Sequence, residues 1–344
     1  MAATPPPLPP PAAAARLAAL EQAVSGTVLG QAQAVRETLA CLVAGGHALL
    51  EGPPGVGKTL LVRALAAATG LSFSRVQFTP DLLPADVTGT HVLLDLPEGR
   101  RFVFQRGPLF GNLVLADEIN RATPRTQAAL LEAMAEQAVS AGSERIPLPA
   151  PFCVLATQNP IEMEGTFPLP EAQLDRFLLK VQVAAPDEAA LVAIFQRTAQ
   201  PEPTLPGAVL APGEVASLQA AARAVLLPEP LARQVARLVL ATDPGSAGAT
   251  DSARRNLRLG ASPRAGEAIC RVARAAALAA GCDHVRMEDL AFALAPALRH
   301  RLLPSFEAEA RGLVGDRLVA DVLAPVAGLP REVQRVLSAI EPQA

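Results

Sequence analysis

The segment GPPGVGKT, residues 52–59, is the first stretch whose residue types and spacing indicate chemistry. It fits the pattern G-x-x-x-x-G-K-[ST], in which glycines let the backbone wrap a phosphate group with its N–H groups pointing inward. Lys58 can reach the β and γ phosphates of a nucleotide, and the Thr59 hydroxyl can bind Mg²⁺. The predicted nucleotide-binding set is Gly52, Pro53, Pro54, Gly55, Val56, Gly57, Lys58 and Thr59.

A glycine-rich turn can match this pattern by chance. Here an apolar run precedes the segment at residues 47–51, and a helical stretch follows it at residues 59–68. A helix that begins at the loop adds the partial positive charge of its N-terminus to the phosphate cradle. The placement between a strand and a helix therefore favours a phosphate-binding loop over a chance turn.

Two adjacent carboxylates, Asp117 and Glu118, end a second apolar run that reads LVLA at residues 113–116. Asp117 suits the shell of a magnesium ion, directly or through water, and Glu118 can orient and deprotonate an attacking water. Solvated acids at an ordinary strand end are the alternative, which the nearby phosphate loop makes the weaker one. Because the chain lacks a good Asn-Lys-x-Asp element for guanine, the pattern predicts hydrolysis of ATP rather than GTP.

Asn159 follows another apolar run, in the segment ATQNP at residues 156–160. An amide at the end of the strand next to the Asp-Glu strand can hold the attacking water against the γ-phosphate. An Asn-Pro turn explains the dipeptide alone but not its position after a strand. Asn159 is therefore a candidate catalytic residue.

The elements that must position these residues alternate between strands and helices. Strands are predicted at residues 47–51, 73–78, 112–117, 152–157 and 178–183, and helices at 17–24, 33–44, 59–68 and 125–136. Nearly continuous apolar strands separated by helices indicate an α/β fold with a parallel sheet that helices cover on both faces.

Two segments interrupt this alternation and resemble hairpins. Residues 91–95 and 101–105 flank a Pro97-Glu98-Gly99 turn, and residues 138–147 surround Gly142. Each pattern by itself is equally consistent with a plain surface hairpin.

Beyond Pro186 the pattern becomes helical, at residues 214–226, 231–242, 263–280 and 287–298, with no convincing strand. Residues 1–15 are rich in Pro and Ala and predict a flexible tail. We therefore expect a tail at 1–15, an α/β nucleotide-binding domain at 16–185 and an all-helical domain with its connecting segment at 186–344.

Composition limits the class of protein further. Half of the 344 residues are apolar, 18% are charged, the net charge is −3, and Trp and Tyr are absent. A globular protein is indicated, without the basic or aromatic surface typical of a nucleic-acid binder. No run reaches the length of a membrane span and no signal peptide is recognisable, so the expected location is the cytoplasm.

The chain resembles the MoxR family of AAA+ ATPases over about residues 28–303. The matching segments are VLGQ at 28–31, GPPGVGKT at 52–59, QFTPDLLP at 77–84, LADEINRA at 115–122, ATQNP at 156–160, LDRF at 174–177 and SPRA at 262–265. The motifs DEINRA and ATQNP are much more specific to the family than the phosphate-loop motif is.

This resemblance implies a P-loop sheet in the strand order 5-1-4-3-2, a helix-2 insert near residues 90–106, a hairpin before the fourth strand and a helical lid domain. It also implies that Arg176 acts as an arginine finger on the neighbouring subunit's γ-phosphate, and that Arg264 acts as the sensor-2 residue. Arg121 is a weaker candidate for an interface contact. A homo-oligomeric ring, commonly a hexamer, follows because the complete site then lies between subunits.

The resemblance further implies a Mg²⁺-dependent ATPase that remodels or matures protein complexes, with a von Willebrand factor A domain partner. Residues 79–90 offer no aromatic side chain of the kind that threading unfoldases use, so we do not expect processive unfolding. Two alternatives stay open: the AAA+ subunit of a metal-chelatase or metal-insertion system, and a nucleic-acid motor or nucleotide-gated scaffold.

Overall fold

The computed structural model describes residues 6–96, 99–142, 144–159, 165–197 and 204–340. Its centre is a parallel five-stranded sheet in the order β2-β5-β8-β1-β9. Counted in chain order, these strands have the predicted 5-1-4-3-2 arrangement. They are β1 (Ala48–Glu51), β2 (Phe73–Gln77), β5 (Leu113–Asp117), β8 (Cys153–Gln158) and β9 (Leu179–Gln182).

Both faces of the sheet's central strands are buried, which explains why β1, β5 and β8 are apolar at most positions. Leu50 and Leu155 belong to a core with the helices α1, α2 and α3, whereas Leu49 and Val154 face a second core built with α5. The helices of this part are α1 (Pro10–Thr27), α2 (Ala32–Val43), α3 (Lys58–Thr69), α4 (Pro84–Thr88), α5 (Pro124–Glu136) and α6 (Glu171–Leu174), with 3₁₀ turns η1 (Pro108–Phe110) and η2 (Ile119–Arg121).

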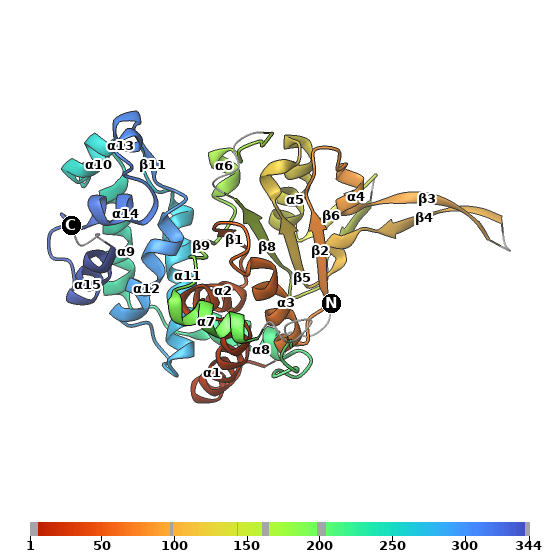
Figure 1. Ribbon diagram of the computed structural model, residues 1–344. Coiled ribbons are helices and arrows are strands. Elements are labelled where there is room, and N and C mark those ends of the chain that lie inside the picture. The colour runs from red at the N-terminus through yellow and green to blue at the C-terminus, as the bar shows by residue number, and fades with distance from the viewer. Residues whose placement is uncertain (1–5, 97–98, 143, 160–164, 198–203, 341–344) are drawn as a thin grey trace.

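The two interruptions are hairpins, as predicted. The strands β3 (Gly89–Leu96) and β4 (Gly99–Arg106) form an antiparallel pair that projects far from the body of the molecule (Figure 1). The predicted turn residues Pro97 and Glu98 lie outside the described residues. At its base Gly89 has φ +100°, and a Cβ there would come within 2.3 Å of the Gln105 carbonyl oxygen. The second hairpin pairs β6 (Ala138–Ala141) with β7 (Glu144–Pro147).

A helical region follows the sheet and lies on the opposite side of the molecule from the β3–β4 hairpin (Figure 1). Its helices, with the connecting helix α7, are α7 (Glu188–Gln196), α8 (Glu214–Ala224), α9 (Glu229–Thr242), α10 (Asp251–Asn256), α11 (Pro263–Ala279), α12 (Met287–Leu298), α13 (Phe306–Ala310), α14 (Gly315–Leu323) and α15 (Arg331–Ile340). One short strand pair, β10 (Leu257–Leu259) with β11 (Leu303–Pro304), departs from the expectation of helices alone. None of the helices in the described segments is long and apolar enough to cross a membrane.

The expectation of a flexible tail through residue 15 is wrong for its second half. Helix α1 begins at Pro10, and Ala13 is fully buried. Proline suits the first helical turn because that turn lacks partners for its N–H groups, and alanine has the highest helix propensity. Leu17, Leu20 and Val24 continue the buried face and hold α1 against the core it shares with α3 and α11.

His47, just before β1, is a buried histidine that the sheet keeps neutral. Its Nδ1 accepts a hydrogen bond from the Val154 N–H at 2.9 Å, and its Nε2 lies 3.3 Å from the Met134 carbonyl oxygen. Burial lowers the pKa of His47 to about 4. Between its ordinary pKa and this value, the unfolded chain binds a proton that the folded chain excludes.

Acidification from pH 7 to pH 5 is therefore expected to remove about 2 kcal/mol of stability through His47 alone. Urea unfolding at the two pH values measures the loss. His47→Gln, which does not titrate, should show a loss smaller by that amount. An equal loss in both proteins would contradict the assignment.

Candidate functional site

The predicted phosphate loop connects β1 to α3 and is shaped by its glycines. Gly55 and Gly57 have φ values of +81° and +94°, and Gly57 immediately precedes the first residue of α3. A Cβ on Gly52 would lie 2.2 Å from the Val183 carbonyl oxygen, so only glycine lets the loop lie against the end of β9. Lys58 Nζ donates to the Gly52 carbonyl and, at 3.0 Å, to the Pro53 carbonyl. The ammonium group thus lies folded over the loop.

Asp117 and Glu118 stand at the carboxyl end of β5, where a threonine of the neighbouring strand orders both. Thr157 Oγ1 donates to Asp117 Oδ1 at 2.6 Å and accepts from the Glu118 N–H at 2.8 Å. Arg75, on β2, donates to Asp117 Oδ2 at 2.7 Å. The Asp117 carboxylate is therefore fixed from both neighbouring strands.

The Glu118 backbone adopts a left-handed conformation, with φ +57°. Such a conformation is unfavourable for a residue with a side chain and is frequent at functional sites. The Glu118 carboxylate accepts a hydrogen bond from Gln77 Nε2 at 2.6 Å and lies 3.3 Å from Arg121 Nε. Two side chains thus hold the carboxylate at one orientation.

Sequence reasoning missed Arg75, Gln77 and Thr157 as partners of the acid pair. Arg75 and Gln77 alternate along β2, a pattern that reads as the solvated face of an edge strand. Only the parallel pairing of β2 with β5, in which Gln77 lies beside Asp117, reveals their role. Arg121, in contrast, was expected at an interface and lies beside Glu118 of its own chain.

A cavity of about 430 Å³ is lined by part of the predicted loop, the acid pair and Asn159, whereas Gly52, Pro53 and Val56 of the predicted loop do not line it. The phosphate loop contributes one wall, and the ends of β5 and β8 contribute the other. The lining residues are Pro54, Gly55, Gly57, Lys58, Thr59, Leu60, Arg63, Asp117, Glu118, Thr157 and Asn159. Thr59 and Asp117 offer oxygen donors in this cavity, which are the donors that Mg²⁺ prefers. The fold therefore brings the loop, the acid pair and Asn159 to one place.

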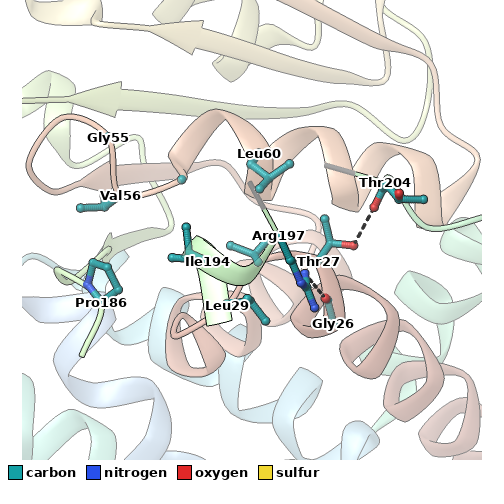
Figure 2. A pocket seen from close by; sticks show the side chains of 12 residues that line it. Gly26, Thr27, Leu29, Gly55, Val56, Leu60, Pro186, Ile194, Arg197 and Thr204 are labelled. Carbon is teal, nitrogen blue, oxygen red and sulfur yellow. Dashed lines mark hydrogen bonds between the residues drawn. The ribbon is translucent and has the colours of Figure 1, made fainter. Parts of the chain in front are cut away.

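A second cavity, of about 570 Å³, shares Gly55, Gly57 and Leu60 with the first. Figure 2 shows its wall, which is mainly apolar and combines the end of α1, the loop and the connecting helix α7. Arg197 Nη1 donates to the Gly26 carbonyl at 3.0 Å across one end. Val28 and Leu29 of the VLGQ segment, which was noted above for its family resemblance, line this cavity. The residues from α7 carried no recognisable signal.

The two predicted arginines, Arg176 and Arg264, do not line either cavity. Arg176 is exposed, and its Nη1 donates to the Leu131 carbonyl at 2.7 Å. Arg264, at the start of α11, has a side chain 65% exposed, with Nη1 3.6 Å from Asp175 Oδ2. Neither arginine is among the residues that line the two cavities. Arg264 thus lies beside Asp175, the residue that precedes Arg176 in the chain.

A phosphate loop between β1 and α3, an acid pair on β5 and a 5-1-4-3-2 sheet followed by a helical lid region define an AAA+ ATPase. Family models agree in both parts of the chain. Residues 47–179 match the ATPase family associated with various cellular activities, and residues 250–322 match the AAA lid domain.

Individual relatives indicate the family within the class of AAA+ ATPases. The chain is 42% identical to the Chaperone MoxR1 of Mycobacterium tuberculosis, over 88% of this chain and 80% of that protein. It is 36% identical to the Protein MoxR of Paracoccus denitrificans, over 87% of this chain and 93% of that protein. A crystal structure of an ATPase from Cytophaga hutchinsonii superposes with a TM-score of 0.83 at 35% identity, covering 92% of this chain and 96% of that one. The chain belongs to the MoxR family of AAA+ ATPases.

Proposed function

We propose that this protein hydrolyses ATP in a Mg²⁺-dependent reaction and uses the energy to remodel or mature protein complexes in the cytoplasm. The observation that carries the proposal is the single cavity in which Lys58, Thr59, Asp117, Glu118 and Asn159 meet. These are the groups needed to hold a triphosphate, a hard cation and an attacking water.

In this proposal each side chain has a distinct task. Lys58 leaves the loop carbonyls and binds the β and γ phosphates, while Thr59 and Asp117 would hold Mg²⁺, which neutralises phosphate charge. Glu118 accepts the proton of the attacking water, and Gln77 and Arg121 keep its carboxylate aimed. Asn159 orients the same water.

The second cavity is the proposed place for the adenine base. It lies next to the phosphate loop, and its apolar wall of Val28, Leu29, Leu60 and Ile194 suits a flat aromatic ring. The triphosphate would then pass from this cavity along Gly55 and Gly57, which line both.

We further propose that Arg176 acts on the nucleotide of a neighbouring subunit in a homo-oligomeric ring of six subunits. Arg264 would act as sensor 2, contacting the γ-phosphate and tying the angle of the helical domain to the nucleotide state. Arg176 is exposed and is not among the residues that line the two cavities of its own chain, which supports its action between subunits. An arginine supplied from another subunit stabilises the charge that builds up on the transferred phosphoryl group. The site of one chain is then incomplete by itself.

The proposed remodelling of protein complexes is supported by family membership, since the related M. tuberculosis protein bears the name chaperone. We propose a client protein reached through a partner with a von Willebrand factor A domain. The projecting β3–β4 hairpin gives the chain a second surface far from the nucleotide site (Figure 1).

Turnover per chain is expected to rise steeply with protein concentration, because complete sites form only when chains assemble. ATP hydrolysis measured across a dilution series, with sedimentation at each concentration, tests this. Lys58→Ala removes the ammonium that binds the phosphates and should lose ATP affinity by at least ~100-fold. The Lys58→Ala protein therefore gives the background rate of ATP hydrolysis in this assay.

Arg233, in α9, is exposed, and Arg233→Ala is the control for loss of a cation. This variant should leave the dependence of turnover per chain on protein concentration unchanged. A turnover per chain that stays constant while sedimentation shows dissociation into monomers would contradict a site shared between subunits. Tight ATP binding by Lys58→Ala would contradict the assignment of the loop.

A further inference from the structure

Arg301, just beyond the end of α12, is a charged residue in an unusual place. Its side chain is only 4% exposed, although no cavity or ligand site described above uses it. A guanidinium is tolerated in a protein interior when its donors are satisfied and its charge is paired. The partners of Arg301 therefore indicate what it holds.

Five hydrogen bonds use all three nitrogens of Arg301. Nε donates to Asp175 Oδ1 at 2.7 Å, and Nη2 donates to the carbonyls of Asp175 at 3.2 Å and Phe177 at 2.7 Å. Nη1 donates to the carbonyls of Leu178 at 3.1 Å and Ala297 at 2.6 Å. Four of the five acceptors belong to the segment 175–178. Asp175, the first residue of this segment, lies 126 residues before Arg301 in the chain.

These acceptors lie on both sides of Arg176 in the chain. Asp175 and Phe177 are each bonded to Arg301, and the Phe177 ring is fully buried. The Arg176 side chain itself points outward and is exposed. The backbone on both sides of Arg176 is thus held by Arg301, while the Arg176 side chain is exposed and bonds only to the Leu131 carbonyl among the contacts described above.

Asp175 extends this connection to the first turn of α11. Ser262 Oγ donates to Asp175 Oδ2 at 3.2 Å, and Arg264 Nη1 lies 3.6 Å from the same oxygen. One carboxylate therefore joins Arg301 after α12 with Ser262 and Arg264 at the start of α11. A shift of these helices relative to the sheet must act on Asp175.

We propose that Arg301 is the positioning residue of Arg176: it couples the placement of α11 and α12 to the finger that enters the neighbouring subunit's site. This inference rests on the proposed function, in which Arg176 acts between subunits. A group displaced by about 1 Å can lose 10²-fold in rate, so a loosened segment has a measurable effect.

Arg299 is a matched control two residues earlier. Its side chain is also 4% exposed, and it bonds to the Lys180 carbonyl at 2.9 Å and pairs with Asp316 and Glu37. None of these partners adjoins Arg176. Lysine at either position keeps the charge but loses the rigid fork of donors, so the same substitution tests the two sites.

The experiment mixes two chains that are each inactive. Arg176→Ala keeps a complete phosphate site but lacks the finger, and Glu118→Gln keeps the finger but lacks the base. Mixed rings of these two chains should recover ATP turnover at the sites between them. Arg301→Lys is then added either to the finger-donating Glu118→Gln chain or to the accepting Arg176→Ala chain.

We expect Arg301→Lys in the donating chain to lower the recovered turnover by roughly 10- to 100-fold. In the accepting chain it should change turnover less than threefold, as should Arg299→Lys in the donating chain. If Arg301→Lys fails to fold or assemble, Asp175→Asn takes its place, because it keeps every backbone acceptor, and it should show the same defect confined to the donating chain.

Equal loss in both chains, or equal loss with Arg299→Lys, would mean a general structural role and would overturn the positioning role. If the unmodified pair of Arg176→Ala and Glu118→Gln recovers no turnover despite confirmed mixed assembly, the finger between subunits is wrong. The role of Arg301 then falls with it.

Discussion

Replacement of Glu118 by Gln is expected to lower ATP turnover by about 10²–10⁴-fold while ATP still binds. The substitution keeps the size of the side chain and removes the oxygen charge that accepts the proton of the attacking water. Gln77, which donates to this carboxylate at 2.6 Å, can still donate to the amide oxygen. The loop, Thr59 and Asp117 keep their contacts, so the oligomer should accumulate with ATP bound.

Single-turnover hydrolysis and equilibrium binding of ATP separate these two effects. Glu136→Gln, at the exposed end of α5 and paired with Arg145, is the matched control and should hydrolyse ATP normally. A Glu118→Gln protein that retained more than a tenth of the turnover would require another base. The left-handed backbone at Glu118 makes the conservative amide the informative change, because a β-branched residue would alter the backbone as well.

Replacement of Arg176 by Ala is expected to lower turnover by about 10³–10⁵-fold without loss of ATP binding. In the proposed ring the finger would meet the phosphates of another chain, so the nucleotide cavity of the altered chain itself should stay intact. Recovery of turnover on mixing with Glu118→Gln chains, as described above, distinguishes this role from a local one. Arg176 has a local contact, the Leu131 carbonyl at 2.7 Å.

If that local contact were the whole role of Arg176, the variant should be less stable and mixing should recover nothing. Thermal unfolding of Arg176→Ala beside Arg145→Ala, an exposed arginine of β7 paired with Glu136, measures the stability effect. We expect both melting temperatures to remain close to that of the unaltered protein.

The central strands of the sheet were predictable because burial on both faces makes nearly every position of such a strand apolar. Leu49 and Leu50 face opposite cores, and both are fully buried, so β1 reads as an unbroken apolar run. Helix α1 was mispredicted in its first turns for the opposite reason. Its Pro and Ala residues resemble a tail in composition, and only contact with the core makes Ala13 a buried position.

The candidate site also contains residues that the sequence could predict and residues that it could not. The phosphate loop, Asp117, Glu118 and Asn159 could be predicted because each is a short motif tied to the end of a strand. The partners of the acid pair could not, since Arg75 and Thr157 reach Asp117 from 42 and 40 residues away. The cavity proposed for the adenine base likewise combines segments that no local pattern connects: Gly26–Leu29, Gly55–Gly57 with Leu60, and Pro186, Ile194, Arg197 and Thr204.

By itself, the sequence determined the phosphate loop, the order of strands and helices and the family, because these depend on spacing along the chain and on which faces must be buried. Only the tertiary structure decided which distant side chains meet. It placed Arg264 and the buried Arg301 at Asp175, the residue before Arg176, and left Arg176 and Arg264 out of the lining of the chain's own nucleotide cavity. A buried guanidinium takes its partners from whatever acceptors the packing brings within reach, and that choice leaves no periodicity in the sequence.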